Sequence, residues 1–366
     1  MMDELFLSAK IEGEEVNDLL EQVDVEENDS RADLATLTFG DSHLILSDIL
    51  HEGLSVEVDL GRTDTHALIF RGMITGIRAH FPSRGQSRVE VQAVDSLIHL
   101  GFKPRTRSWW NTTVSQMVRD IALANGFLPG DIAPEEDAMV EETRPRQQVE
   151  ETDLAFLHRL AQAYDCKLYV EHGKGPDTLN FVATKKLLEA EPIEQTLTFN
   201  ANLEEFSVAF DAFATAAVGR LVTTDPLTGG RVEISEDLVG PAEAQWVPDP
   251  ERMARLGEGA ARLSSLLARA AAKRVRLGDF WRLPSRDAGA PSRPASDRSG
   301  ISGDQARRLG QTGRGRAAGS IWLRPRRRVN VEGYGGRWSG DWYLARVRHE
   351  LDLRRRLYVS AFICTR

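Results

Sequence analysis

Apolar and polar residues alternate in short runs through the first hundred residues. A period of two is typical of strands with one buried face. We predict strands at residues 35–39, around Val56, at 67–79 and at 88–94. Sharp turns at 61–62 and 82–85 favour hairpins, and the acidic stretch 12–33 is predicted to be rich in turns. A small closed or nearly closed β-barrel fits this pattern best.

The C-terminal segment 324–366 repeats this order of elements. Apolar runs predict three strands, at 329–331, 342–347 and 357–362. An aromatic-x-Gly triplet opens the central strand in both places, at Phe70-Arg71-Gly72 and at Trp338-Ser339-Gly340, 268 residues apart. The two ends of the chain are therefore predicted to hold copies of one unit.

The spacing inside each copy supports the repeat. Gly72 precedes Val89 by 17 residues, and Gly340 precedes Leu357 by the same number. If the copies align on this step, their last strands superpose. The predicted correspondence sets Val89, Val91 and Ala93 over Leu357, Val359 and Ala361.

Helical periodicity replaces alternation from residue 101 onward. Apolar residues recur at helical spacing after Thr112 or Thr113, either of which is suitable as an N-cap, and Gly126 predicts the end of that helix. Thr152 predicts the cap of a second helix, and a hairpin follows over 167–171 and 178–183. Residues 101–194 are thus predicted to form a compact α+β module.

The rest of the chain returns to strands and then loses its pattern. Strands are predicted at 197–199, 204–210, 216–223 and 231–234, and apolar residues recur at helical spacing over 250–276. The 35 residues of 284–318 include six Gly, five Ser and seven Arg, a composition that favours a flexible loop.

These segments predict an α+β fold that is mainly β, with two similar small β-barrel domains flanking the α+β module. The predicted ranges are 1–100 for the first barrel, 101–194 for the module, 195–249 with 319–366 for the second barrel, 250–283 for a helical insertion and 284–318 for the loop.

Composition is that of an ordinary soluble protein, with 41% hydrophobic and 28% charged residues in a chain of 366. The first ten residues lack a basic start followed by an apolar block, so synthesis in a cytoplasm without a signal peptide is expected. No window approaches the roughly 18 apolar residues of a membrane span. Cys166 and Cys364 are both set in apolar runs, which predicts buried free thiols.

Charge is unevenly distributed. Residues 271–366 hold 22 Lys and Arg against 8 Asp and Glu, a balance of +14, which leaves −23 for residues 1–270 out of a total of −9. Such a division indicates surfaces with different partners, although solvated faces are an equally weighted alternative. Basic clusters suit either nucleic acid or, twice as readily in an acidic chain, an acidic protein. The interface candidates are Arg326, Arg327, Arg328, Arg354, Arg355, Arg356, Trp338 and Trp342.

Residues with catalytic chemistry form no recognisable constellation. Glu150, Glu151 and Asp153 lie where a helix N-terminus favours acids. His158 and His349 lack a second ligand at metal spacing. We therefore predict no enzyme activity, no catalytic residue, no metal and no cofactor.

Three segments resemble the tail hub of contractile phage tails, the late control D protein family, which is similar to the hub portion of type VI secretion spike proteins. They are 69–74, 148–161 and 338–344 with Val347 and His349 beyond. The central one is the most distinctive: a glutamine and acids precede Asp153-Leu-Ala-Phe-Leu-His-Arg-Leu-Ala161. The resemblance covers nearly the whole chain.

The resemblance implies a homotrimer whose two barrels per subunit make a pseudo-sixfold ring. Such a hub joins the sixfold tail tube protein to the threefold central spike protein. Baseplate wedge proteins are further implied partners, with the tape measure protein as an additional candidate, and the protein is expected in the baseplate of a phage tail or injection particle. The alternatives are a baseplate-associated cell-wall-active enzyme and a nucleic-acid-binding tail protein.

Overall fold

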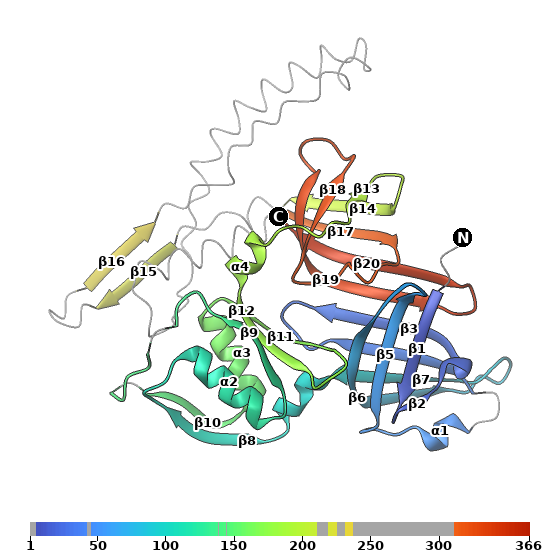
Figure 1. Cartoon of the computed structure of the whole chain (residues 1–366), viewed down its shortest axis with the longest axis horizontal. Coiled ribbons are helices and arrows are strands. Elements are labelled where there is room, and N and C mark those ends of the chain that lie inside the picture. The colour runs from blue at the N-terminus through green and yellow to red at the C-terminus, as the bar shows by residue number, and fades with distance from the viewer. Residues whose placement is uncertain are drawn as a thin grey trace, which may run out of the picture.

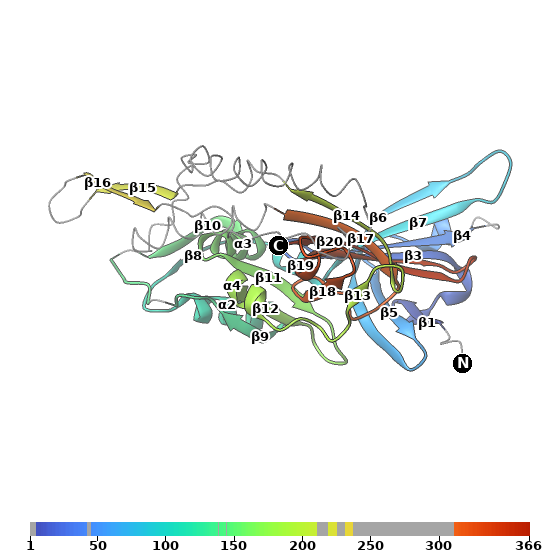
Figure 2. The ribbon, with the colours of Figure 1, turned by 90° about the horizontal axis from the view of Figure 1, so that it is seen from above.

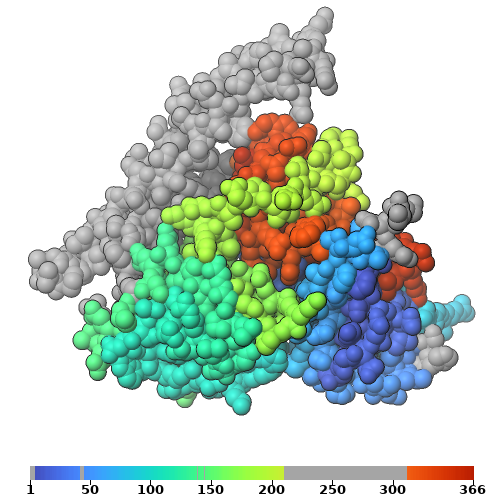
Figure 3. Space-filling view, viewed as in Figure 1, coloured from blue at the N-terminus to red at the C-terminus, as the bar shows by residue number. Residues whose placement is uncertain are grey.

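The fold was analysed in a computed structural model that describes residues 5–41, 45–137, 139–143, 145–210, 219–224, 231–236 and 311–366. The chain is mainly β with a few short helices. Figure 1 shows three bodies: a first β unit in blue, an α+β module in green, and a second β unit in orange and red with β13 (Leu197–Thr198) and β14 (Leu203–Phe210) in yellow-green. The space-filling view shows the module and the first unit side by side, with the second unit resting above them (Figure 3).

The first unit contains β1 (Leu5–Ile11), β2 (Glu14–Glu15), η1 (Asn17–Leu19), β3 (Leu20–Asn28), β4 (Leu34–Gly40), α1 (Leu46–Ile49), β5 (Ser55–Arg62), β6 (Thr65–His80) and β7 (Arg88–Asp95). The module contains η2 (Ser96–Gly101), β8 (Pro104–Trp109), α2 (Val114–Ala124), β9 (Leu128–Ala133), β10 (Arg146–Thr152), α3 (Asp153–Ala163), β11 (Cys166–Glu171), β12 (Thr178–Ala183) and α4 (Thr184–Glu189). The second unit contains β13 (Leu197–Thr198), β14 (Leu203–Phe210), β17 (Gln311–Ala318), β18 (Arg328–Glu332), β19 (Gly340–Asp352) and β20 (Leu357–Thr365). A separate hairpin contains β15 (Gly219–Thr224) and β16 (Arg231–Glu236).

The two β units share one 13-stranded sheet. Its strands run in the order β14-β17-β20-β19-β3-β4-β7-β6-β5-β1-β2, with β18 on β19 and β13 on β18. The pair β3–β19 is the point where the first unit continues into the second. Of the predicted second-barrel range 195–249, β13 and β14 join this sheet, whereas β15 and β16 pair with each other in a separate two-stranded sheet.

The two units have the same strand order. In the first unit the order is β3-β4-β7-β6-β5, and in the second it is β14-β17-β20-β19-β18. Every one of these neighbouring pairs is antiparallel in both units. The predicted duplication is therefore confirmed in topology. The units differ in the strand that follows these five: β1 runs antiparallel to β5, whereas β13 runs parallel to β18.

A β-bulge marks corresponding residues in the outer strand of each unit. β3 has a register shift between Leu20 and Gln22 where it pairs with β4. β14 has the same shift between Leu203 and Glu205 where it pairs with β17. Since a bulge inserts one extra residue at one place in a ladder, matching the two bulges aligns β3 with β14.

A second bulge aligns the central strands. β6 shifts register between Ile74 and Gly76 opposite β7, and β19 shifts between Leu344 and Arg346 opposite β20. Residues 76–80 of β6 thus correspond to residues 346–350 of β19. The two bulges together fix one consistent alignment of the units, strand by strand.

This alignment corrects the predicted superposition by three residues. The 17-residue step pairs Val89, Val91 and Ala93 with Leu357, Val359 and Ala361, whereas the bulges pair them with Ser360, Phe362 and Cys364. Three is odd, so the prediction placed the wrong face of β20 inward. Leu357 is 42% exposed and Ala361 is partly exposed, whereas Ser360, Phe362 and Cys364 are all buried; Val359 is the one member of the predicted set that is also buried.

The prediction that residues 12–33 form turns is wrong for residues 20–28, which form β3. Its sequence LEQVDVEEN carries four acids, and three of them, Glu21, Asp24 and Glu27, are less than a tenth exposed. Acidic residues are depleted in strands because burial of a charge is costly without a partner. Cationic partners from distant residues, described below, make this strand possible.

The predicted loop 284–318 is wrong in its last eight residues, which form β17 between β14 and β20. Gly313 and Gly315 occupy inward positions there. A β-carbon at Gly315 would lie 2.7 Å from Cε1 of Phe362, and one at Gly313 would lie 3.0 Å from Cε2 of Phe206. The glycines thus make room for two aromatic rings. The predicted helical insertion 250–283, and residues 284–310 of the loop, lie outside the described residues.

The α+β module follows its sequence signals closely. Thr113 caps α2 by accepting a hydrogen bond from the N–H of Gln116 (3.2 Å), and Thr152 caps α3 by accepting one from Ala155 (3.2 Å). Gly126 adopts a φ of 84° just after α2, as a helix stop requires. Helices α2 and α3 pack on the sheet β11-β12-β9 around a separate apolar core.

Candidate assembly surfaces and the junction between the units

In the first arginine cluster Arg326 is buried, whereas Arg327 and Arg328 are partly exposed and stay predicted interface residues. Arg326 is 7% exposed, donates to the backbone oxygen of Asn28, and stacks its guanidinium 4.2 Å from the ring centre of Tyr169. Arg328 donates to the backbone oxygen of Ala190 (2.9 Å) and pairs with Asp341 (2.8 Å). For Arg326 the prediction of a partner-binding surface is wrong, since its burial holds the second unit against the first unit and the module.

The second arginine cluster is more exposed. Arg354 pairs with Glu21 of β3 and donates to Gln86 (2.8 Å), so its charge already has partners within the chain. The side chain of Arg355 is 80% exposed and lies 3.6 Å from Asp352, and Arg356 is also exposed. Arg355 and Arg356 stay predicted interface residues.

The two tryptophans differ in availability. Trp342 is fully buried, and its indole N–H donates to the backbone oxygen of Trp338 (3.1 Å). Trp342 is therefore a core residue, and the prediction that it contacts a partner is wrong for this fold. Trp338 is half-buried under the guanidinium of Arg337, which lies 4.4 Å from its ring centre, and stays a candidate.

A buried ionic cluster joins β3 to β19. The carboxylate of Glu27 accepts from Nε of Arg324 (2.8 Å) and lies 3.3 Å from Nε2 of His349, and the side chains of Glu27 and His349 are 0% exposed. Burial alone would raise the pKa of Glu27, but the Arg324 guanidinium and His349 hold it below its ordinary value. Glu27 is therefore ionised, and it needs both partners to be buried at this seam.

Further polar groups surround this cluster. Nδ1 of His349 lies 3.0 Å from the hydroxyl of Tyr358, which orients the imidazole toward Glu27. Nearby, the backbone N–H of Asp33 donates to the carboxylate of Asp95 (2.9 Å). Burial raises the pKa of Asp33 and raises that of Asp95 to about 6. Sequence reasoning missed this cluster, and the available signal was four acids in the nine residues 20–28, next to apolar residues.

Arg71, in the interior of β6, attaches the first unit to the module. It pairs with Glu57 of β5 (2.8 Å) and with Asp177 of the module (2.9 Å), and it donates to the backbone oxygens of Gly175 (2.8 Å) and Gly173 (3.0 Å). The loop between β11 and β12 is thus held by one guanidinium. Ion pairs thus join the first unit to the module and to the second unit, and the stacking of Arg326 on Tyr169 joins the second unit to the module.

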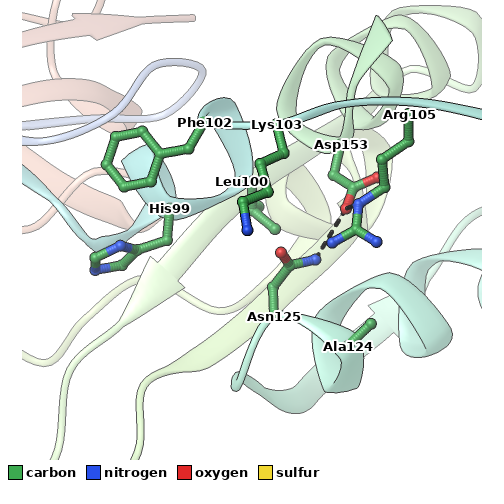
Figure 4. A pocket seen from close by; sticks show the side chains of 8 residues that line it. All are labelled: His99, Leu100, Phe102, Lys103, Arg105, Ala124, Asn125 and Asp153. Atoms are coloured by element: carbon green, nitrogen blue, oxygen red, sulfur yellow. Dashed lines mark hydrogen bonds and ion pairs between the residues drawn. The ribbon is translucent and has the colours of Figure 1, made fainter. Parts of the chain in front are cut away.

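A cavity of about 510 Å³ opens in the module beside α3. Figure 4 shows the carboxylate of Asp153 between Arg105 and Asn125 at its wall. Asp153 is 1% exposed, pairs with Arg105 (3.2 Å) and with Arg107, and accepts from Asn125 (3.0 Å). All of these contacts neutralise and fix the carboxylate, as expected for a structural acid at the start of a helix.

Metal and membrane sites were also sought in the described parts of the chain. No group of three or more His, Cys, Asp or Glu there is arranged to hold a metal ion. None of the described helices has the length and apolar character needed to cross a bilayer.

Several strands have a free edge among the described strands, and two of these edges belong to the large sheet that joins the β units. β14 pairs with β17 on one side only, and β6 pairs only with β7 beyond its bulge at Gly76. Unpaired edges present backbone donors and acceptors to other strands. These edges are the second class of candidate assembly surface.

Comparison with known proteins points to one family. The family model described as phage tail baseplate hub (GPD) matches residues 31–353. No curated protein matches the sequence. Among solved structures, the 43 kDa tail protein of prophage MuSo2 from Shewanella oneidensis has a TM-score of 0.67 at 11% identity, covering 99% of this chain and 98% of that one.

Two further solved structures are similar. A tail protein from Neisseria meningitidis MC58 has a TM-score of 0.64 at 13% identity, covering 99% of this chain and 97% of that one. The E. coli c3393 protein, described as a component of the type VI secretion system, has a TM-score of 0.53 at 15% identity, covering 97% of this chain and 76% of that one. At such low identity these similarities establish a shared fold.

Proposed function

The chain belongs to the phage tail baseplate hub family, and on that premise we propose that it is a trimeric adaptor joining a sixfold tail tube to a threefold central spike. A structural role in a tail baseplate is what the family assigns. The trimer, the tube and the spike are the specific content of the proposal.

The observation that carries the proposal is the duplicated β unit. Each chain holds two units with the same strand order, the same antiparallel pairing and the same two bulges. Three chains would present six similar units, which suits a sixfold partner, while the chain as a whole repeats only three times. A single fold can in this way meet both symmetries.

The junction supports the same role. A hub between two rings must keep its units at a fixed angle, and buried ionic contacts are specific in geometry. Glu27, Arg324 and His349 fix the first unit on the second, and Arg71 fixes the module. The units therefore act as one rigid body.

We propose a structural protein without catalysis. The acids that most resemble a catalytic pair are engaged: Asp153 is buried between arginines, and Glu151 pairs with Arg159 (2.7 Å). Failure of the purified protein to clear cell-wall substrate is the expected result. Clearing that is lost on Glu151→Gln would overturn this part.

The proposed partners are the tail tube, the central spike and the baseplate wedge proteins, with the tape measure protein as a further candidate. Exposed Arg355 and Arg356 suit an acidic protein surface. Reversal of both charges is expected to slow association with such a partner and to reduce its salt dependence, measured by surface-immobilised binding. Salt-sensitive binding to DNA would instead favour a nucleic-acid role.

Solution mass tests the central claim. Light scattering is expected to give about three times 40.7 kDa, alone or after addition of the spike protein. Electron microscopy of the complex with tube protein should show a six-membered ring on one side. A mass of one chain under all of these conditions would refute the adaptor.

A further inference from the structure

β3 pairs with β19 inside one chain. The two strand edges that correspond to β3 and β19 in the other copy of the unit have no neighbouring strand among those that the structure describes. β3 corresponds to β14, and the part of β19 that pairs with β3 corresponds to β6 beyond its bulge. Among the described strands, both of these counterparts have a free edge. The β3–β19 contact within one chain therefore serves as a template for a strand pairing between two chains.

We propose that β14 of one copy pairs antiparallel with residues 77–82 of the next copy, which are the end of β6 and the two residues after it, in the register of β3 on β19. This deepens the proposed trimer by naming its contact. In β3–β19, Leu351 lies opposite Val23, Glu350 opposite Asp24, His349 opposite Val25 and Arg348 opposite Glu26. Transferred through the bulges, Phe81 lies opposite Phe206, His80 opposite Ser207, Ala79 opposite Val208 and Arg78 opposite Ala209.

The exposure of Phe81 in the single chain supports this register. Phe81 is 56% exposed in the single chain, whereas its counterpart Leu351 is 0% exposed and packs in the core of the first unit. Its proposed neighbour Phe206 is half-buried and packs against Trp342 with ring centres 5.5 Å apart. Pairing would cover Phe81 and extend this aromatic cluster, giving an exposed large apolar residue a structural reason.

The hydrogen-bond pattern is compatible with Pro82. In the template, the N–H of Leu353 donates to Glu21 and the N–H of Asp29 donates to Ala345, both at 3.0 Å. Hydrogen-bonded pairs alternate along an antiparallel ladder, so Asp352 opposite Gln22 is a non-hydrogen-bonded pair. Pro82 corresponds to Asp352, where the missing N–H is not needed.

The two contacts differ in charge. In the template, Arg346 pairs with Glu26 and Arg348 pairs with Asp24, both at 3.4 Å. The counterparts of these acids in β14 are Ala209 and Ser207, so the contact between chains rests on backbone hydrogen bonds and on Phe81. We expect it to depend little on salt.

The contact is head-to-tail, since two different edges meet. Such contacts make a closed ring when the rotation between copies closes. Around six units, the β3–β19 contact within a chain would then alternate with the proposed contact between chains. The free end of hairpin β6–β7 projects from the body in Figure 2, where another copy can reach it.

Engineered disulfides test the register. His80 and Ser207 are both exposed and form a proposed non-hydrogen-bonded pair, the kind with the shorter Cα separation. The native thiols Cys166 and Cys364 are buried and do not interfere. Oxidation of the double variant H80C/S207C is expected to give covalent dimers and trimers on non-reducing gels, ending at the trimer.

Controls separate register from proximity. Variants with either cysteine alone should give no ladder, and R78C/E205C, which is out of register by four residues, should cross-link at most weakly. Efficient linkage of R78C/E205C would overturn the register. A trimeric mass without linkage of H80C/S207C would overturn this contact but leave the trimeric hub standing, whereas a monomeric mass without linkage would overturn both.

Discussion

Replacement of Gly315 by alanine is expected to destabilise the protein, and shortening Phe362 is expected to rescue it. Gly315 of β17 lies directly opposite Phe362 of β20, and a β-carbon there would lie 2.7 Å from Cε1 of the ring. The ring is 3% exposed and is surrounded by core residues, so it has little room to move. Gly315 does not have a positive φ, so backbone strain adds nothing to the expected loss of stability.

The magnitudes follow from packing. Overpacking costs about 1–3 kcal/mol, and the smaller backbone entropy of alanine in the unfolded chain returns about 0.4–1 kcal/mol, so Gly315→Ala should lose about 1–2 kcal/mol. Phe362→Leu alone leaves a void and should lose about 1–2 kcal/mol. In the double variant the added methyl group partly fills that void, so a favourable coupling of about 1–2 kcal/mol is expected.

Urea unfolding followed by tryptophan fluorescence measures the cycle, because the fully buried Trp342 lies in the same core as Phe362. Gly336→Ala is the matched control, since a β-carbon there meets nothing within 4 Å and its effect should add to that of Phe362→Leu. Additive losses for the 315/362 pair would refute the packing account and the placement of β17.

Three further predictions concern the junction and the free edge. Glu27→Gln leaves the Arg324 charge buried without its carboxylate and should cost about 3–5 kcal/mol in urea unfolding; adding Arg324→Met should recover part of this, and an unchanged midpoint would contradict the ionic seam. Burial raises the pKa of Asp95 to about 6, above its unfolded value, so this group favours folding below about pH 4 and loses that contribution as pH rises through 6. Asp95→Asn should remove that dependence, shifting the stability difference from wild type by about 2–3 kcal/mol between pH 4 and 7; parallel profiles would disprove it. Phe81→Ser should weaken trimer formation by about 1–2 kcal/mol per contact, seen by sedimentation, with the unfolding midpoint of the isolated chain unchanged; equal association would count against the β6 edge.

Sequence patterns predicted the parts of the fold in which local signals agree with tertiary structure. Helices α2 and α3 have threonine caps and helical periodicity, and both are confirmed. Strands β4 to β7 alternate cleanly because one face lies on an apolar core. The duplication was also visible in the sequence. However, the aromatic-x-Gly triplets that suggested it are not in corresponding positions, because the bulges align Gly72 with Trp342 and not with Gly340.

Failures occurred where distant residues decide the outcome. β3 was hidden because its acids are stabilised by Arg324, Arg348 and Arg354, which lie about three hundred residues away in sequence. β17 was hidden because its glycines match large rings on neighbouring strands. Likewise Arg326 was predicted at a docking surface because it belongs to a run of three arginines, yet it packs on Tyr169 and donates to the backbone of Asn28. No local pattern carries such information.

The fusion of two units through β3 and β19 also affects how their contacts evolve and form. Units linked in one polypeptide meet at an effective concentration set by the chain that connects them, not by the amount of protein in solution. That contact is thus made during folding, irrespective of how much protein the cell produces. A substitution on β3 alters only the inner seam, and one on β14 alters only the outer edge. Two units encoded in one chain can therefore differ in the strength of the inner seam and of the proposed outer contact, which identical units encoded by a single-unit gene are unable to do.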